Sequence, residues 1–141
     1  MQYKSLNIYR DGITPPAEPY TFYILRIGNN AGKPLKEPCA NCYAFRCTNN
    51  DSYEFYYWLA YGLWQGKMFM PYLRGSVINF IIKSEFLKVV KEAESKVQGQ
   101  YEFYMKTLKT VNVYEKKAAN LLYQAQLLQT AKQVMLRQLL K

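Results

Sequence analysis

The sequence predicts an α+β protein, with a small, mostly antiparallel sheet and one aromatic-rich helix in residues 1–83 and a coiled-coil-like hairpin of two helices in residues 84–141. Two observations predict this class. Short segments rich in aromatic and β-branched residues, separated by stretches with proline and glycine, fill the first part and are typical of strands. From Ser84 onward apolar residues recur at spacings of three and four, which is the period of an amphipathic helix. We expect the hairpin to pack on the first domain or on a partner chain.

The strands predicted in the first domain are all short. They are residues 3–10, 20–28, 42–47 and 76–82. The last of them, SVINFII, follows a turn at Arg74-Gly75 and is expected to be buried, because it is apolar throughout. The stretch at 11–19, DGITPPAEP, predicts a loop and not a tight hairpin, and residues 29–41 form a second irregular stretch.

A helix is predicted from Asp51 to Trp64, stopping at Gln65-Gly66. Asp51 has the side chain of an N-cap residue, and Glu54 follows at the spacing of a capping box, in which each side chain accepts a hydrogen bond from a backbone N–H at the start of the helix.

The aromatic composition of this helix allows two interpretations. A helix that is apolar nearly all round is normally buried, so core packing is the simpler one. The alternative is an exposed aromatic patch containing Trp58 and Trp64, flanked by Lys67 and Arg74. Aromatic rings that stack on bases, beside cations that meet phosphates, are the components of single-strand binding sites. Neither an RNP pattern nor a GXXG loop accompanies them.

The C-terminal part carries two apolar series. The first runs from Phe86 to Val111, and the second is a heptad seam with one polar exception. The seam residues are Tyr114, Ala118, Leu121, Ala125, Leu128, Lys132, Met135 and Leu139. Asn112 and Glu115 have the spacing of a second capping box, which favours two matched helices of about 27 residues, each about 40 Å long. The alternative is one helix of more than about 50 residues, whose seam would need a partner chain.

The chain is basic, with a net charge of +9, and no acidic residue follows Glu115. Basic residues and glutamines recur there, and the candidates for contact with a partner are Lys116, Lys117, Lys132 and Arg137. This surface could meet an anionic partner or simply face solvent. Net charge bears on solubility and non-specific binding, not on the fold.

No histidine occurs in the chain. Cys–His and Ser–His–Asp nucleophiles are therefore excluded, since their general base is missing. The acidic residues are scattered and form no pair suited to acid/base chemistry. We expect no enzymatic activity, no catalytic residue, no metal site and no cofactor.

All the cysteines lie in the segment EPCANCYAFRC, at Cys39, Cys42 and Cys47. A structural zinc site needs four ligands, and neither a fourth thiol nor a histidine is present to complete it. A redox pair at Cys39 and Cys42 fits the spacing, but that motif usually opens a helix, and here a strand-like run follows. We interpret the cysteines as structural, with redox and metal roles as alternatives.

The stretch GNNAGKP at 28–34 has some features of a phosphate loop. It departs from the Walker pattern, because only three residues separate Gly28 from Gly32 and Pro34 stands where the hydroxyl residue belongs. A turn is the simpler interpretation. Backbone N–H groups beside Lys33 remain a candidate anion site.

The N-terminus has no signal-peptide pattern, and the longest apolar run, at 77–82, is far shorter than the roughly 20 residues that span a bilayer. We therefore expect a cytoplasmic protein that does not enter a membrane.

The pieces GNNAGKPLKEPCANCYAF, YWLAYGLWQGKMF and LRGSVINFI resemble small uncharacterised proteins of Bacteroidetes genomes and mobile elements, a domain family of unknown function. The resemblance covers about residues 20–82 and leaves the C-terminal helices outside. It implies a bacterial, cytoplasmic and element-encoded origin, and it brings no catalytic residues.

These observations lead to ordered hypotheses on function. The first is a non-enzymatic interaction or adaptor protein that self-associates or docks on a protein partner through its C-terminal helices. The second is a nucleic-acid-binding accessory protein that uses the basic surface and the aromatic residues. The third is a thiol redox or metal-binding protein.

Overall fold

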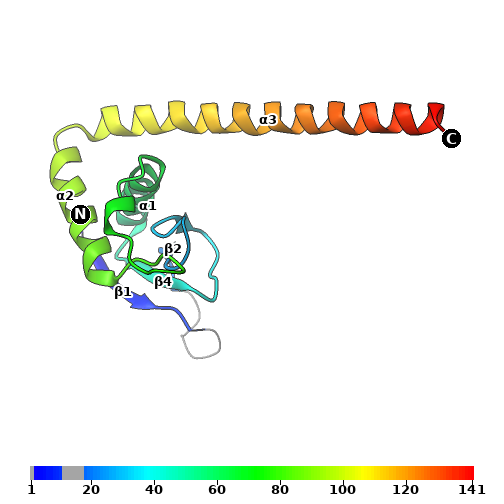
Figure 1. Cartoon of the computed structure of the whole chain (residues 1–141). Helices are drawn as coiled ribbons and strands as arrows, with labels where there is room; N and C mark the ends of the chain where they lie inside the picture. Colours follow the sequence, from blue (N-terminus) through cyan, green and yellow to red (C-terminus); the bar gives the residue numbers. More distant parts are fainter. Residues whose placement is uncertain (1, 11–17) are drawn as a thin grey trace. The chain divides into compact units, whose positions relative to one another are not determined.

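The computed structural model describes residues 2–10 and 18–141 and divides into two compact units, Met1–Tyr101 and Glu102–Lys141. The sequence had instead predicted a domain boundary between residues 83 and 84. The fold is α+β, as predicted (Figure 1). In chain order the elements are β1 (Tyr3–Ile8), β2 (Thr21–Leu25), β3 (Pro34–Leu35), β4 (Cys42–Cys47), α1 (Asn50–Gln65), a short 3₁₀ helix (Met70–Tyr72), α2 (Lys83–Val97) and α3 (Tyr101–Leu139).

The strands form one antiparallel sheet in the order β1-β4-β2-β3. β4 has the bounds predicted for it, and β1 and β2 lie within the segments predicted as strands. β3 is a two-residue strand inside the stretch expected to be irregular. The predicted loop at 11–19 falls largely on residues outside the described part of the chain.

Alternate residues of the two central strands give the sheet two different faces. One face carries Phe22 and Phe45, whose rings stack at 4.8 Å between centroids. Helices α1 and α2 cover this face, since Phe45 also contacts Tyr56 of α1 at 5.3 Å and Phe86 of α2 at 6.4 Å. These rings are the centre of the main core. The opposite face holds a smaller buried cluster of Tyr23, Cys42 and Ala44.

Helix α1 begins one residue earlier than predicted, and its cap differs. Asn49 is the N-cap, and its side chain accepts a hydrogen bond from the backbone N–H of Ser52 at 2.8 Å. Asp51 lies inside the first turn, and Glu54 instead accepts a hydrogen bond from Trp58 Nε1 at 2.9 Å. The predicted Asp51–Glu54 capping box is therefore wrong. Either Asn or Asp can cap a helix, so residue type alone did not distinguish the two positions.

The segment 76–82 is not the buried strand that its composition predicted. Gly75 has φ of 110°, and the chain from Arg74 to Phe80 closes in a turn held by two backbone hydrogen bonds. Val77 is 94% exposed, and only Ile81 is fully buried in this stretch. Residues 79–81 pair with the stretch 26–28 through an isolated bridge between Ile27 and Phe80 and two backbone hydrogen bonds, whereas residues 76–78 lie in the exposed turn.

The two C-terminal helices have different lengths from those predicted. α2 ends at Val97, and α3 runs without interruption through Asn112 and Glu115, where the break was expected. The break lies at 98–100, around Gly99, a residue with about 1 kcal/mol lower helix propensity than alanine. The prediction of two matched helices is therefore wrong, and so is that of one helix over the whole region.

Candidate functional site

One flank of α1 carries a row of aromatic side chains in mutual contact, here called the aromatic ladder. It consists of Tyr53, Tyr57, Trp58, Tyr61 and Trp64. Successive ring centroids are 5.9, 5.2, 5.3 and 6.0 Å apart. All five side chains are half-buried, while Phe55, Tyr56, Leu59 and Leu63 face the core. The helix is therefore buried on its core-facing side, and the ladder is neither fully buried nor fully exposed.

Two lysines lie over the ladder. Lys33 Nζ is 4.8 Å from the centroid of a Trp64 ring, and Lys36 Nζ is 5.9 Å from that of Tyr57. Both distances are within the range of cation–π attraction. These lysines come from β3 and its flanks, which contact α1. One acidic group lies at the ladder as well, because Glu54 accepts a hydrogen bond from Trp58.

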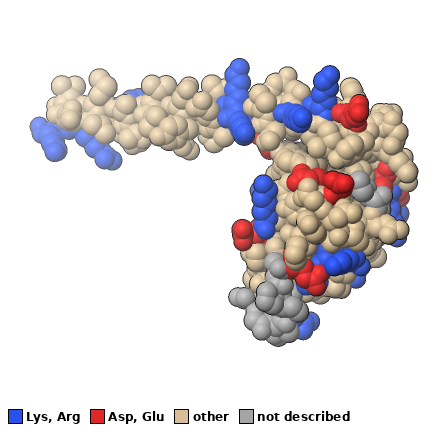
Figure 2. Space-filling view, turned by 180° about the vertical axis from the view of Figure 1, so that it is seen from behind, with Lys and Arg blue, Asp and Glu red and all other residues tan. Residues whose placement is uncertain are grey.

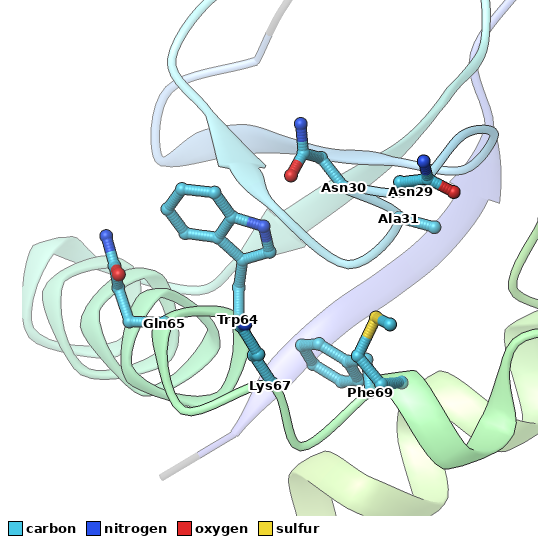
Figure 3. Close-up of a pocket in the computed structure, with 8 residues that line it drawn as sticks. Asn29, Asn30, Ala31, Trp64, Gln65, Lys67 and Phe69 are labelled. Atoms are coloured by element: carbon cyan, nitrogen blue, oxygen red, sulfur yellow. The ribbon is translucent and has the colours of Figure 1, made fainter.

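A hollow of about 140 Å³ lies at the Trp64 end of the ladder (Figure 3). Trp64, Gln65 and Lys67 line it from α1 and the turn that follows, with Phe69 and Met70 beyond them. The segment 29–31 lines the opposite side (Figure 3). Pockets that enclose a drug-sized ligand measure about 300–1,000 Å³, so this one has room for a single ring or side chain.

Backbone hydrogen bonds and the conformation of Gly32 fix the shape of the loop that forms one wall of this hollow. Gly32 has φ of 99°, and a Cβ there would collide with the Phe69 ring, so only glycine fits. Asn79 Nδ2 donates to Asn29 Oδ1 at 2.8 Å, which ties the loop to the segment 76–82. The backbone N–H groups of 28 and 31–33 all donate to carbonyls of the protein. An anion beside Lys33 would therefore be held by side chains and not by these amides.

The structure brings together only some of the candidate residues. Trp64 and Lys67 line the hollow, Lys33 lies over the Trp64 ring, and Trp58 lies farther along the ladder. Arg74 instead forms an ion pair with Glu85 at 3.3 Å. Sequence reasoning missed Lys36, since nothing in its neighbourhood indicates that it reaches the helix. The remaining basic candidates, Lys116, Lys117, Lys132 and Arg137, all lie on α3.

A second hollow, of about 380 Å³, lies beside the segment 76–82. Its lining is mainly apolar and includes Ile78, Phe80 and Tyr43. Arg26 is the charged residue among those that line it, and its guanidinium lies 5.9 Å from the Tyr43 ring centroid.

The cysteines are free and belong to the sheet and its approach. Cys42 and Cys47 are buried, and Cys42 Sγ donates a hydrogen bond to the backbone oxygen of Cys39 at 2.9 Å. Burial raises the pKa of Cys42 to about 11 and that of Cys47 to about 12. Both thiols are therefore protonated near neutral pH, and a protonated thiol is a poor nucleophile. Among the described residues, no group of three or more Cys, Asp or Glu side chains is placed to hold a metal ion.

The raised thiol pKa values predict a loss of stability at alkaline pH. In the unfolded chain these thiols ionise near their ordinary pKa of about 9, whereas in the folded protein they stay protonated up to about 11 or 12. Their contribution is thus complete below pH 9 and is lost as the pH rises through 11 to 12. Tyr56 acts in the same direction, because burial raises its pKa too. Urea unfolding between pH 8 and 11 should show this decline, and it should be shallower for Cys42→Ala/Cys47→Ala. An equal decline in wild type and variant would contradict this role of the thiols.

Helix α3 has an apolar seam and is the single element of its unit, Glu102–Lys141. From Val113 onward every residue is exposed, including Leu121, Leu128 at 73%, and Met135. The outer half of α3 displays Lys and Arg and no acidic side chain (Figure 2). No helix in the described part of the chain is both long and apolar enough to cross a membrane.

Comparison with protein families identified a match over most of the chain. The model of a family described as "Family of unknown function (DUF6943)" matches residues 6–138. The match extends well beyond the resemblance found over 20–82, and it includes α2 and almost all of α3. No curated protein and no solved structure matches the chain. The family description names no source, so the bacterial, element-encoded origin stays a prediction.

Proposed function

The chain belongs to this family of unknown function (DUF6943), and we propose from its own residues that it is an interaction protein that pairs with a second copy of itself through α3. The observation that carries the proposal is the heptad seam from Tyr114 to Leu139 on a helix whose unit contains no other element. A lone helix has nothing within its own unit on which to bury such a face. Most helical stability in proteins comes from packing an apolar face against another element.

The period of the seam favours another helix as the partner. Alternating spacings of four and three keep a face aligned along a supercoil, so two helices stay in contact over its whole length. The seam from Tyr114 to Leu139 is about 38 Å long at 1.5 Å per residue. A globular surface would instead favour an apolar stripe with a period of 3.6 residues, which stays on one face of a straight helix, whereas a heptad seam drifts around such a helix by about 20° per heptad.

The residues along the seam fit an antiparallel copy. When the helix is placed against itself reversed, every small or polar residue faces a large apolar one. The facing pairs are Tyr114 with Leu139, Ala118 with Met135, Leu121 with Lys132, and Ala125 with Leu128. Small residues opposite large ones let the layers interdigitate, and the Lys132 stem can lie along Leu121 with its ammonium in water.

A parallel pair fits much less well. It would place Ala118 and Ala125 each against its own copy, which leaves gaps in the seam. It would also bring the two Lys132 side chains together in the interface, where like charges repel in surroundings of low dielectric. We therefore commit to the antiparallel arrangement.

The charge of the pair gives it a distinctive salt dependence. Each chain carries +9, so two copies repel, and the basic residues of α3 lie close to the interface. Added salt screens this repulsion, with a Debye length of about 10 Å at 0.1 M. We expect the dimer to become tighter as salt rises.

Sedimentation equilibrium on the full chain tests the proposal. The expected result is a reversible equilibrium between the 16.6 kDa chain and a species of twice that mass, shifted toward the larger species between 50 mM and 500 mM KCl. A chain that remains 16.6 kDa at every concentration and salt would contradict it and would favour a different protein as partner. A trimer or tetramer would contradict the antiparallel pair.

A further inference from the structure

We propose that the aromatic ladder of α1, with Lys33, Lys36 and Lys67 beside it, is a binding site for single-stranded nucleic acid. The bases stack on the ladder and its last base enters the hollow next to Trp64. This inference rests on the first unit alone and does not depend on pairing through α3.

The aromatic rings provide the stacking surface. The five rings of the ladder are half-buried, so each keeps some exposed surface, although Tyr53 and Tyr57 also contact the core ring of Phe22. Successive ring centroids are 5.2–6.0 Å apart, and the angles between successive ring planes range from 10° to 88°, so the ladder is a row of differently oriented rings. Single bases can stack on individual rings without regard to sequence, because every base has a π face.

The hollow at Trp64 suits one base. Its volume of about 140 Å³ is too small for a whole drug-sized ligand but accommodates a flat ring. Trp64 and Phe69 supply apolar surface, and the lining also includes the amide residues Asn29, Asn30 and Gln65. Asn29 Oδ1 accepts a hydrogen bond from Asn79, and Gln65 Nε2 donates one to Tyr61. Amide side chains donate and accept hydrogen bonds, which matches the polar edges of bases.

The three lysines lie where they can contact the phosphates of a bound strand. Lys33 lies over the Trp64 ring, Lys36 lies over Tyr57, and Lys67 lines the hollow. A base that stacks on the same face of either ring would displace the ammonium group from that face toward its own phosphate. The carboxylate of Glu54 lies at Trp58, so the Trp64 end is the more favourable for anions.

The combination of groups distinguishes nucleic acid from other anionic partners. An acidic peptide would use the lysines but would leave the stacked rings and the amide-lined hollow without a matching group. An apolar peptide would use the rings but would leave the lysines unpaired. A single strand alone offers flat rings, polar edges and one charge for each unit.

The test is a titration of the full-length protein with fluorescein-labelled oligo(dT) of about twelve nucleotides, a length within known site sizes. Anisotropy gives the affinity as a function of KCl concentration. With three phosphate contacts, the slope of log K against log salt should be about −2, and Lys33→Gln should make it shallower by about 0.7. Trp64→Leu should weaken binding by about 5- to 150-fold.

Matched variants separate this site from general basicity. Lys88→Gln removes the same charge from α2, where Lys88 lies over Tyr72, and should leave the affinity within about twofold of wild type after allowance for net charge. Circular dichroism checks that Trp64→Leu is folded, and Lys33→Gln gives an independent answer if it is not. In Trp58→Phe, the remaining Trp64 fluorescence should be quenched when oligo(dT) binds, as stacking requires.

Several outcomes would overturn the proposal. Equal affinity for a duplex would exclude stacking as the source of binding. A binding loss in Lys116→Gln/Lys117→Gln with none in Trp64→Leu would place the contact on α3. Displacement of oligo(dT) by poly-glutamate at equal charge would show an acidic-peptide site instead. No binding at 50 mM KCl would end the proposal, while leaving self-association through α3 untouched.

Discussion

Replacing Leu121 and Leu128 by glutamate should convert the proposed dimer into a monomer of 16.6 kDa. In the antiparallel arrangement both leucines lie in the seam, so the double variant removes four buried leucines from each dimer. Burial of one leucine side chain contributes about 1.5–3 kcal/mol. The loss of four is about 6–12 kcal/mol, which raises the dissociation constant at least about ten-thousandfold.

A control with the same charge change can be placed on the other side of α3. Gln126 and Thr130 are exposed and lie outside the seam, so Gln126→Glu/Thr130→Glu also adds two negative charges but leaves the interface intact. This control should keep its dimer, and partial neutralisation of the basic helix should tighten it slightly. Sedimentation equilibrium measures both. Equal dissociation in the two variants would show that charge, and not the seam, governs the mass, and would contradict the proposed interface.

Phe45→Ala should destabilise the first unit by about 3–5 kcal/mol, which is a large share of the roughly 5–15 kcal/mol that holds a typical domain folded. Phe45 is 1% exposed and lies on the central strand β4. Its ring contacts Phe22 at 4.8 Å and Tyr3 at 4.9 Å between centroids, as well as rings of α1 and α2. Truncation therefore opens a cavity where the sheet and both helices meet.

Urea denaturation followed by circular dichroism measures this loss. Phe103→Ala is the matched control, because it makes the same change at a side chain that is 70% exposed. Exposed substitutions normally stay within about 0.5 kcal/mol. A similar change in both variants would show that Phe45 is not central to the core.

Most elements of the first unit could be predicted from the sequence, and the segments that were predicted wrongly have local causes. β4 was predicted with its observed bounds because Pro38 precedes it and its own residues are aromatic and apolar. The segment 76–82 has equally strand-like residues, yet the chain turns back at Gly75, and in this segment only residues 79–81 pair with another stretch, 26–28, through an isolated bridge. Strand propensity mainly reports how a side chain fits its neighbours in a sheet, so it fails where those neighbours are missing.

The end of α2 was not predicted, because the pattern at Asn112 and Glu115 was given more weight than Gly99. Asn112 and Glu115 resemble a capping box, but the weak propensities around them each cost less than about 1 kcal/mol, and the hydrogen bonds of a continuous helix offset them. Gly99 was expected to be tolerated inside a helix, and the chain breaks there instead.

The sequence by itself determined the fold class, the position of most strands and helices, and the heptad seam of α3. These features depend on residues within a few positions of each other, whose periodicity and turn chemistry can be read directly. Only the tertiary structure decided that Lys33 lies over Trp64, that Lys36 joins the same surface, and that the aromatic ladder of α1 stays partly exposed. Those contacts join residues far apart in the chain, and they depend on how the sheet and the helix pack, which no local pattern specifies.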